Sequence, residues 1–257
     1  PVRDESLTRE HEYSKLAEHG VDIPLSTRQY SINTGLWGGT IGGGETHDSW
    51  AEIPDHVYDL VLDAEKTIES EQIVIEFEKG IPTKIDGTAY AGPELLAVLG
   101  KKCRRHRVGL DVHIGDTVLG IKGRIAFEAG AGIVLIKAHR ELEKITTTSW
   151  QRFWKDQMGE FYGKLLHEGQ VFEPALRDIE ALIDSSQERV SGESRVRLDQ
   201  GSFAVTGVRS PHSMMDSVSG VYGEMPTLWD GQDTRGYAKI VAVPARLHRG
   251  AAGKESS

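Results

Sequence analysis

The pattern of apolar and polar residues changes several times along the chain between a helical period and a strand period. Apolar residues recur at helical spacing in segments 8–20, 92–103, 131–145, 148–169, 173–192 and the beginning of 233–250. Alternating or short apolar runs interrupted by turn residues occupy segments 72–87, 110–130 and 193–211. No internal repeat accompanies these changes. The pattern therefore predicts a chain that mixes helices with paired strands.

Residues that begin or end helices flank most of the helical segments. Thr8 can cap the first helix, and Gly20 is suited to end it. Pro93 and Pro174 each stand in the first turn of a helix, where the missing N–H has no intrahelical acceptor to lose. In the last helical segment Pro244 is expected to kink or end the helix, because its ring clashes with the preceding turn.

Segment 148–169 is the clearest helix of the chain, and it begins behind a Thr/Ser cap. Its large apolar residues form one stripe, which consists of Trp150, Phe153, Trp154, Phe161 and Leu165. A stripe of this width on one side of a helix predicts burial, either in the core or at a subunit interface.

The three strand-like segments are each interrupted by a pair of turn residues. These pairs lie at 79–80, 115–116 and 200–201. Two strands joined by so short a turn form a hairpin and pair antiparallel. The predicted fold class is therefore α+β, with a mostly antiparallel sheet packed against helices, rather than a doubly wound parallel sheet.

A glycine-dense stretch runs from Tyr30 to Trp50 and contains two hydroxyl side chains, Ser31 and Thr40. Glycine weakens both helices and strands, so the stretch is expected to be a loop. Such a loop is either a plain surface connection or one whose backbone must come close to another group. The residues alone leave both interpretations open.

Composition narrows the classes of partner. The chain has 257 residues and a net charge of −9, so its surface as a whole does not attract nucleic acid or an anionic membrane. One basic cluster, residues 101–107, resembles a nucleic-acid patch in isolation. It follows a helical segment, however, and cations at a helix C-terminus are stabilised by the helix dipole. We interpret it as a solvated helix end, with an anion site as the alternative.

The chain has a single cysteine, Cys103, so no disulfide can form within it. A chain without an internal disulfide suits a reducing compartment. The aliphatic run at residues 133–136 is far too short to span a bilayer, and residues 1–10 lack the apolar core of a signal peptide. The expected location is the cytoplasm.

Self-contained catalytic or metal-binding motifs do not occur in the sequence. It has no HExxH, no CxxC pair and no GxSxG, so nothing supports a zinc protease, a cysteine-ligated metal or a serine hydrolase. Two glycine-rich stretches, 38–46 and 128–133, lack the spacing of a phosphate-binding loop. No metal site and no ATP loop are expected in this chain.

A family resemblance is carried by motifs that follow one another in a single order. They are "EHGVDIP", "YSINTGLWGGTIGGGE", "GLDVHIGDTVLGIKGR", "FEAG", "IKAHRELEKITTT", "DQMGEFYGKLLHEGQVFEPALRDIEALIDSSQERVSG" and "SPHSMMD". Together they resemble argininosuccinate synthase, in its C-terminal synthetase and multimerisation region, from near the first residue to about Leu247. The residues of the central motifs resemble those of a divergent bacterial branch of the family. The family's N-terminal nucleotide-binding domain, with its SGGxDTS loop, has no counterpart in these residues.

The resemblance implies a division of the chain. Residues 1–25 would form a linker helix that follows the nucleotide-binding domain, and residues 26–230 the synthetase domain, which binds substrate. Residues 231–250 would form a C-terminal oligomerisation helix, and residues 251–257 a disordered tail. The implied assembly is a homo-oligomer, with a tetramer as the expected state.

The resemblance also implies the chemistry. The family joins citrulline to aspartate with ATP and Mg, through a citrulline adenylate, and releases pyrophosphate and AMP. ATP is bound mainly by the N-terminal domain, so this chain is expected to be inactive alone and to contribute substrate binding without a catalytic residue of its own. In the family two hydroxyls of the glycine-dense stretch hold citrulline, and those positions match Ser31 and Thr40.

At three further positions the sequence differs from, or only matches in part, the family's pattern. A glutamate that contacts citrulline is replaced by Gly115, with Asp116 offering a carboxylate one residue later. A tyrosine that contacts citrulline is replaced by Phe127, which has no hydroxyl, while Arg124 matches a family arginine that either supports the site or touches substrate. A catalytically silent oligomerisation or regulatory paralogue therefore remains the alternative function.

Overall fold

The computed structural model describes residues 8–24, 29–58, 68–215 and 228–252. The chain divides into two compact units, Pro1–His212 and Ser213–Ser257. Within the described residues, no helix combines the length and apolar character that crossing a membrane requires. The two units are described separately below.

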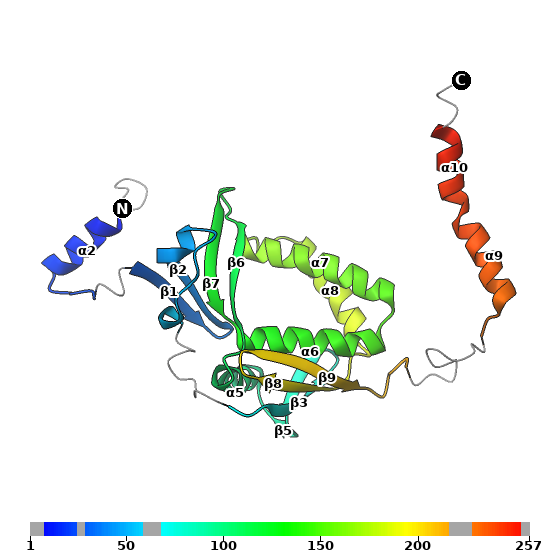
Figure 1. Ribbon diagram of the computed structural model, residues 1–257, viewed down its shortest axis with the longest axis horizontal. Helices are drawn as coiled ribbons and strands as arrows, with labels where there is room; N and C mark the ends of the chain where they lie inside the picture. The colour runs from blue at the N-terminus through cyan, green and yellow to red at the C-terminus, as the bar shows by residue number, and fades with distance from the viewer. Residues whose placement is uncertain (1–7, 25–28, 59–67, 216–227, 253–257) are drawn as a thin grey trace. The chain divides into compact units, whose positions relative to one another are not determined.

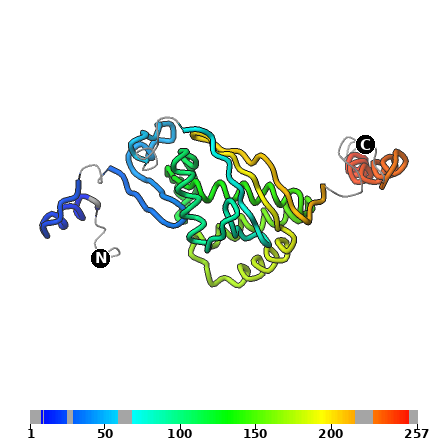
Figure 2. The backbone as a smooth tube through the Cα atoms, turned by 90° about the horizontal axis from the view of Figure 1, so that it is seen from below, coloured from blue at the N-terminus to red at the C-terminus, as the bar shows by residue number. Residues whose placement is uncertain are grey.

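The core of the first unit is a five-stranded antiparallel sheet with the order β5-β4-β3-β8-β9. Its strands are β3 (Glu71–Glu78), β4 (Ile81–Ile85), β5 (Thr88–Ala89), β8 (Gly192–Asp199) and β9 (Ser202–Arg209). In Figure 2 the cyan β3 and the yellow β8 and β9 run side by side. The turns at 79–80 and 200–201 close two of its hairpins, as the sequence predicts.

Two helices cover one face of this sheet, α5 (Gly92–Arg105) and α6 (Gly130–Thr146) (Figure 1). Alternate residues of β3, among them Ile73 and Ile75, are fully buried against the helices, as the strand period requires. On β8 the buried Ser194 donates its hydroxyl to the Ala138 carbonyl of α6, at 2.9 Å. This satisfies a polar group inside an otherwise apolar core.

A second, four-stranded antiparallel sheet has the order β1-β2-β7-β6. Its strands are β1 (Tyr30–Gly35), β2 (Gly38–Gly43), β6 (Leu110–Asp116) and β7 (Lys122–Glu128). A small core of Tyr30, Ile41, Ile53, Val57, Tyr58 and Ala126 covers one of its faces. The segment after β2 supplies part of that cover and contains two short 3-10 helices, η1 (Gly44–His47) and η2 (Asp55–Val57).

Two sequence predictions about this sheet are wrong. Residues 30–43 of the glycine-dense stretch form the β1–β2 hairpin instead of a loop, because pairing with β7 fixes a backbone that glycine alone would leave free. Residues 115–116 also continue strand β6, and the turn lies at residues 117–121. There the Thr117 hydroxyl accepts the Ile121 N–H at 3.2 Å. This hydrogen bond stabilises the turn, whereas Gly115 and Asp116 are part of the strand.

Two further helices, α7 (Ser149–His167) and α8 (Ala175–Gln187), pack on each other. Thr148 caps α7 and forms a reciprocal capping box with Gln151, which confirms the predicted helix start. The aromatic stripe of α7 is largely exposed: Trp150, Phe153, Trp154 and Phe161 are 47–71% exposed, and only Leu165 is buried. Within the described chain the stripe is therefore not a core.

At the N-terminal side, α2 (Arg9–Glu18) begins at its predicted cap, Thr8. The chain leaves the helix through Gly20 at φ 78°, a backbone conformation that glycine adopts without strain.

The second unit contains α9 (Gly231–Val241) and α10 (Val243–Ala252). Asp230 caps α9 by accepting the N–H groups of Gln232 and Asp233. The helix ends at Val241, and α10 starts immediately after it with Pro244 in its first turn, so the predicted interruption is confirmed. Together with the two sheets and their packed helices, this confirms the α+β prediction.

Candidate functional site

One row of directly paired residues crosses all strands of the four-stranded sheet, and three of its four side chains are polar. The printed pairs are Asn33 with Thr40, Thr40 with Phe127, and Phe127 with Asp111. Directly paired residues project from the same face of a sheet. The row therefore runs Asn33–Thr40–Phe127–Asp111 on one face, from β1 to β6.

Ser31 projects from this same face. It pairs with Gly42, which lies two positions from Thr40 on β2 and therefore shares its side of the strand. We call this face, defined by Ser31, Asn33, Thr40, Asp111 and Phe127, the polar face. Asn33 and Asp111 are exposed, while Ser31, Thr40 and Phe127 are half-buried.

Two glycines of β2 allow the chain to approach its own backbone closely. Gly38 has φ 131°, and a Cβ there would lie 1.8 Å from the Glu128 carbonyl oxygen of β7. Gly43 has φ 94°, and a Cβ there would lie 2.4 Å from the carbonyl oxygen of Gln29. At these two positions glycine is required by strand packing, independently of any ligand.

The opposite face of the sheet carries Arg124, which binds backbone. Its guanidinium donates to the carbonyls of Glu45 at 3.1 Å and Ala51 at 2.8 Å, and also to that of Asp48. These bonds hold the segment that follows β2 against the sheet. Arg124 thus supports the sheet from behind the polar face.

Tyr30 ties the same segment to β1. Its hydroxyl donates to the Glu45 carboxylate at 2.5 Å. Burial, together with this hydrogen bond to a carboxylate, raises the pKa of Tyr30 to about 12. Tyr30 therefore remains a neutral donor that helps to fix the strand carrying Ser31.

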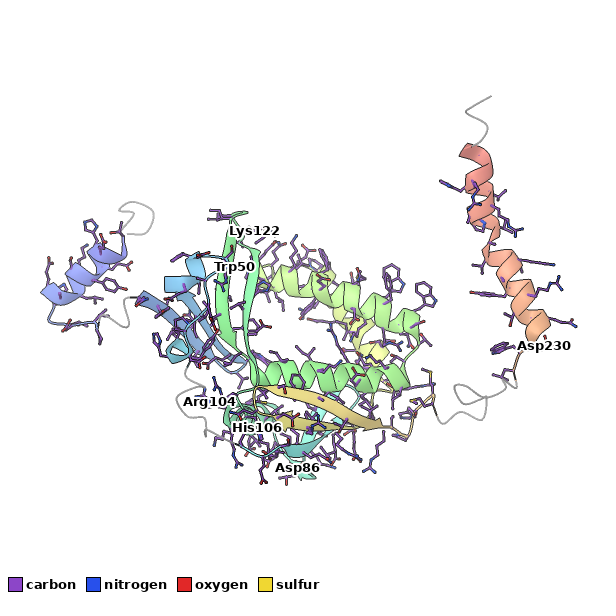
Figure 3. All side chains as sticks on the ribbon, viewed as in Figure 1. Trp50, Asp86, Arg104, His106, Lys122 and Asp230 are labelled. Atoms are coloured by element: carbon purple, nitrogen blue, oxygen red, sulfur yellow. The ribbon has the colours of Figure 1, made fainter. Side chains whose placement is uncertain are left out.

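Asp116 lies at the end of β6 and, by the alternation of the strand, on the Arg124 side of the sheet. It is well exposed and forms an ion pair with Lys122, 2.6 Å between Oδ1 and Nζ. Figure 3 shows Lys122 at the end of the β6–β7 hairpin. The structure thus brings Ser31, Thr40 and Phe127 together and separates Asp116 and Arg124 from them.

Two residues of the polar face, Asn33 and Asp111, were not among the sequence candidates. The signal that identifies them is strand parity: each stands an even number of residues from a candidate or directly opposite one. That signal exists only once 30–43 and 110–128 are recognised as neighbouring strands of one sheet.

A cavity of about 420 Å³ lies on the other side of the β1–β2 hairpin. Ile32 and Thr34 of the hairpin line it, and neither belongs to the polar face. Cys103 also lines it, but that thiol is almost fully buried, and burial raises its pKa to about 12. The cysteine is therefore a poor nucleophile at neutral pH.

The basic cluster at residues 101–107 is engaged within the chain. Lys102 pairs with the Glu71 carboxylate, and Arg107 pairs with Asp55 at 3.3 Å. The cluster is thus the predicted helix end of α5, but much of it is paired or buried within the chain and not simply solvated.

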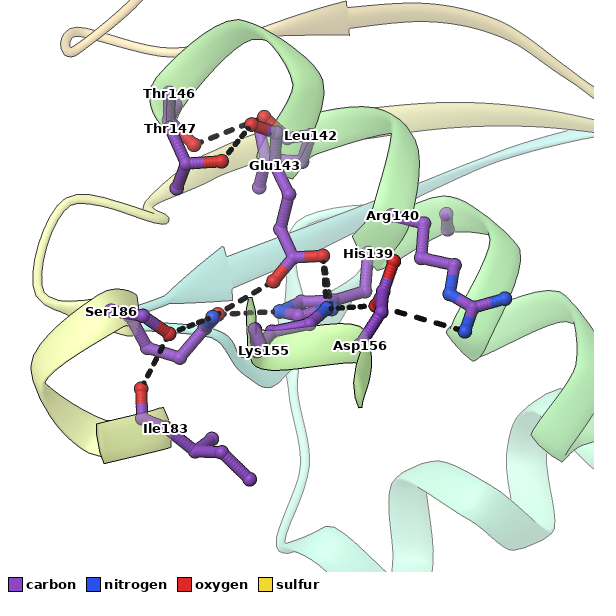
Figure 4. Close-up of polar contacts among 12 residues, drawn as sticks. His139, Arg140, Leu142, Glu143, Thr146, Thr147, Lys155, Asp156, Ile183 and Ser186 are labelled. Atoms are coloured by element: carbon purple, nitrogen blue, oxygen red, sulfur yellow. Dashed lines mark hydrogen bonds and ion pairs between the residues drawn. The ribbon is translucent and has the colours of Figure 1, made fainter. Parts of the chain in front are cut away.

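A buried polar network joins α6, α7 and α8 (Figure 4). The Glu143 carboxylate accepts from Lys155 at 2.5 Å and from the Gln187 amide at 2.8 Å. His139 lies 2.8 Å from the amide oxygen of Gln187, and burial lowers the pKa of its imidazole. Each of these groups has a partner inside the network, which is the pattern of a structural connection.

Comparison with known proteins connects the polar face to a family. The family model described as the arginosuccinate synthase C-terminal domain matches residues 30–248, which include both sheets. The chain belongs to the argininosuccinate synthase family. Its matched region contains the whole polar face.

Curated relatives agree with this assignment. The chain is 33% identical to an argininosuccinate synthase of Pyrococcus furiosus, over 96% of the chain and 60% of that protein. It is 34% identical to one of Methanosarcina barkeri, over 97% of the chain and 63% of that protein. It is also 32% identical to an argininosuccinate synthase of Bacillus pumilus, over 96% of the chain and 62% of that protein. The chain thus spans about 60% of the length of these relatives, which are ligases.

Proposed function

We propose that this chain is the synthetase part of an argininosuccinate synthase. In this role it binds citrulline and helps to position aspartate for the ATP-dependent formation of argininosuccinate, AMP and pyrophosphate in arginine biosynthesis. The observation that carries the proposal is the polar face, which presents the hydroxyls of Ser31 and Thr40 beside Phe127 within the region that matches the family. Hydroxyls that both donate and accept hydrogen bonds suit a polar amino acid.

The remaining two candidates take lesser roles in this proposal. Arg124 acts as a positioning residue, since its bonds to three carbonyls brace the sheet from behind. Asp116 is paired with Lys122 at the strand end, so we assign it no direct contact with citrulline.

The described residues do not fit ATP. The stretch 38–46 is mostly strand β2, whose backbone pairs with β1 and β7. The other glycine-rich stretch leads into α6, where a Cβ on Gly130 would lie 2.4 Å from the Val108 carbonyl oxygen and 2.5 Å from the Cys103 Cβ. The backbone of β2 is thus held in strand pairing, and the stretch before α6 lacks the spacing of a phosphate-binding loop. We therefore assign ATP and Mg to the family's nucleotide-binding domain, which is a partner of this chain in the proposed enzyme.

A second candidate is a catalytically silent oligomerisation or regulatory paralogue. Gly115 favours it, because no side chain is available where the family has a glutamate, and the imidazole of His113 lies over that position. Phe127 likewise has no hydroxyl to offer. An experiment on the hydroxyls separates the two candidates.

Replacing Thr40 with valine keeps the shape of the side chain and removes its hydroxyl. If Thr40 binds citrulline, the affinity of the complete enzyme should weaken by about 1–2 kcal/mol, with little change in melting temperature. Calorimetric titration with citrulline measures this. Thr34→Val is the matched control, because Thr34 stands on the other side of the same hairpin. Unchanged affinity in Thr40→Val would favour the silent paralogue.

We further propose a homo-oligomer, with a tetramer as the expected state, in a cytoplasmic location suited to the lone cysteine. Two exposed apolar surfaces support the assembly: the aromatic stripe of α7, and a set on α9 and α10 that consists of Tyr237, Ile240, Val241, Val243 and Leu247. Apolar surfaces of this extent are typical of subunit contacts.

Light scattering tests the assembly. The chain at micromolar concentration should have a mass several times that of one subunit. Ile240→Asp should lower that mass, because a charge would enter the apolar contact, whereas Gln232→Asp at the start of α9 should not. A monomer under these conditions rules the proposal out.

A further inference from the structure

The substrate of the proposed function is a zwitterion, with an ammonium group and a carboxylate on one carbon and a neutral ureido group at the far end. An ammonium group removed from water requires acceptors, and a carboxylate is the strongest of these. Ser31 and Thr40 provide hydroxyls but no charge. The binding face therefore needs an acidic group that the hydroxyls do not supply.

The strand register places one carboxylate on this face. Among the residues of the four strands, the polar face carries the side chain of Asp111 as its one acid, and Asp116 projects from the other side. Asp111 is exposed, and one of its oxygens accepts the Val112 N–H at 2.7 Å. No ion pair joins Asp111 to any other described residue, in contrast to the Asp116–Lys122 pair.

The distances across the sheet suit an amino acid. Asp111 and Thr40 both pair with Phe127, so they flank it on either side. Neighbouring strands are about 4.8 Å apart, so the Cα atoms of Thr40 and Asp111 are roughly 10 Å apart across two gaps. A small amino acid lying over Phe127 can then meet the Thr40 hydroxyl and the Asp111 carboxylate at the same time.

His113 lies between Asp111 and Gly115 on this face. It is two residues from Asp111 on β6, and its imidazole lies over Gly115, where a Cβ would come within 2.5 Å of Nε2. The space above Gly115 is thus occupied. Asp111, the acid of this face, lies on the other side of His113.

We propose that Asp111 is the counter-ion that binds the ammonium group of citrulline. In this arrangement the hydroxyls of Ser31 and Thr40 donate to the substrate carboxylate, and the ureido group extends away from the sheet. The proposal rests on the proposed function and specifies which end of the substrate this chain binds. It also assigns the acidic contact to Asp111 in place of Asp116.

The test compares two ligands on three proteins. The ligands are citrulline and 5-ureidopentanoic acid, which has the same chain without the ammonium group. The proteins are the complete enzyme containing the unchanged chain, Asp111→Asn, and the matched control Asp116→Asn. Calorimetric titration gives each affinity, and far-UV circular dichroism confirms that the variants fold.

Asp111→Asn should weaken citrulline binding about tenfold to a hundredfold, because a charge-assisted hydrogen bond is lost. It should leave binding of 5-ureidopentanoic acid within about twofold, and Asp116→Asn should change neither. If Asp111→Asn weakens the binding of both ligands equally, or leaves citrulline binding unchanged, the assignment of Asp111 is overturned. The proposed function is not affected by that result. An unchanged chain that does not bind citrulline overturns the proposed function, and the assignment with it.

Discussion

The 257-residue chain alone should release no pyrophosphate when ATP, citrulline and aspartate are supplied together. Forming an adenylate requires the phosphates of ATP to be held and their charge neutralised by donors already in place. In the described residues neither glycine-rich stretch has the spacing of a phosphate-binding loop. One is paired in β2, and the other is packed against Val108 and Cys103.

Adding the nucleotide-binding domain of the same enzyme, covalently or in trans, should restore activity. The measurement is a pyrophosphate-release assay on the chain alone and on the combined preparation. Thr40→Val in the combined preparation provides a control, because it should reduce activity without abolishing it. Turnover by the isolated chain would mean that the phosphates bind within these residues, at the α6 N-terminus or at β2.

Glu143→Ala should lower the free energy of unfolding by about 3–5 kcal/mol. Glu143 is almost fully buried and accepts hydrogen bonds from Lys155 and Gln187. Without its carboxylate, the Lys155 ammonium group remains largely buried with its nearest acceptor gone. The loss should also loosen α7 and α8 from α6, since the network joins them.

Glu141→Ala is the matched control on the same helix. Glu141 bonds Lys137 at 2.6 Å and Lys144 at 2.8 Å, but both lysines are about half exposed. Exposed ion pairs of this kind contribute up to about 1 kcal/mol. Urea unfolding followed by far-UV circular dichroism compares the two variants. If Glu143→Ala is destabilised no more than Glu141→Ala, the network does not have the structural role described here.

Helix positions were predictable from the sequence because their signals are local. The cap at Thr8, the capping residue Thr148 and the interruption before Pro244 each act within one turn of the backbone. The hairpins at 79–80 and 200–201 were predictable for the same reason. The exposure of the α7 stripe was not predictable from the sequence, because the same apolar period occurs in helices buried in a core and in helices at a subunit interface.

The candidate site was predictable only in part. The resemblance selected Ser31, Thr40 and Phe127, and the strand register places these three on one face. The same register adds Asp111 from a strand about 70 residues further along the chain, and it places Arg124 and Asp116 on the opposite side. Which candidate residues share a face of the sheet can be determined only once the pairing of the strands is known.

By itself, the sequence determined the α+β class, most helix boundaries and membership of the argininosuccinate synthase family. These depend on short-range periodicity, on capping and on the order of motifs. Only the tertiary structure decided that the glycine-dense stretch is a hairpin, that its glycines accommodate neighbouring backbone, and that one face of the sheet is polar. Those features depend on pairing between the β1–β2 hairpin and the β6–β7 hairpin, which are distant from each other in sequence. Because side chains alternate along a strand, a shift of one residue in that pairing would exchange the two faces.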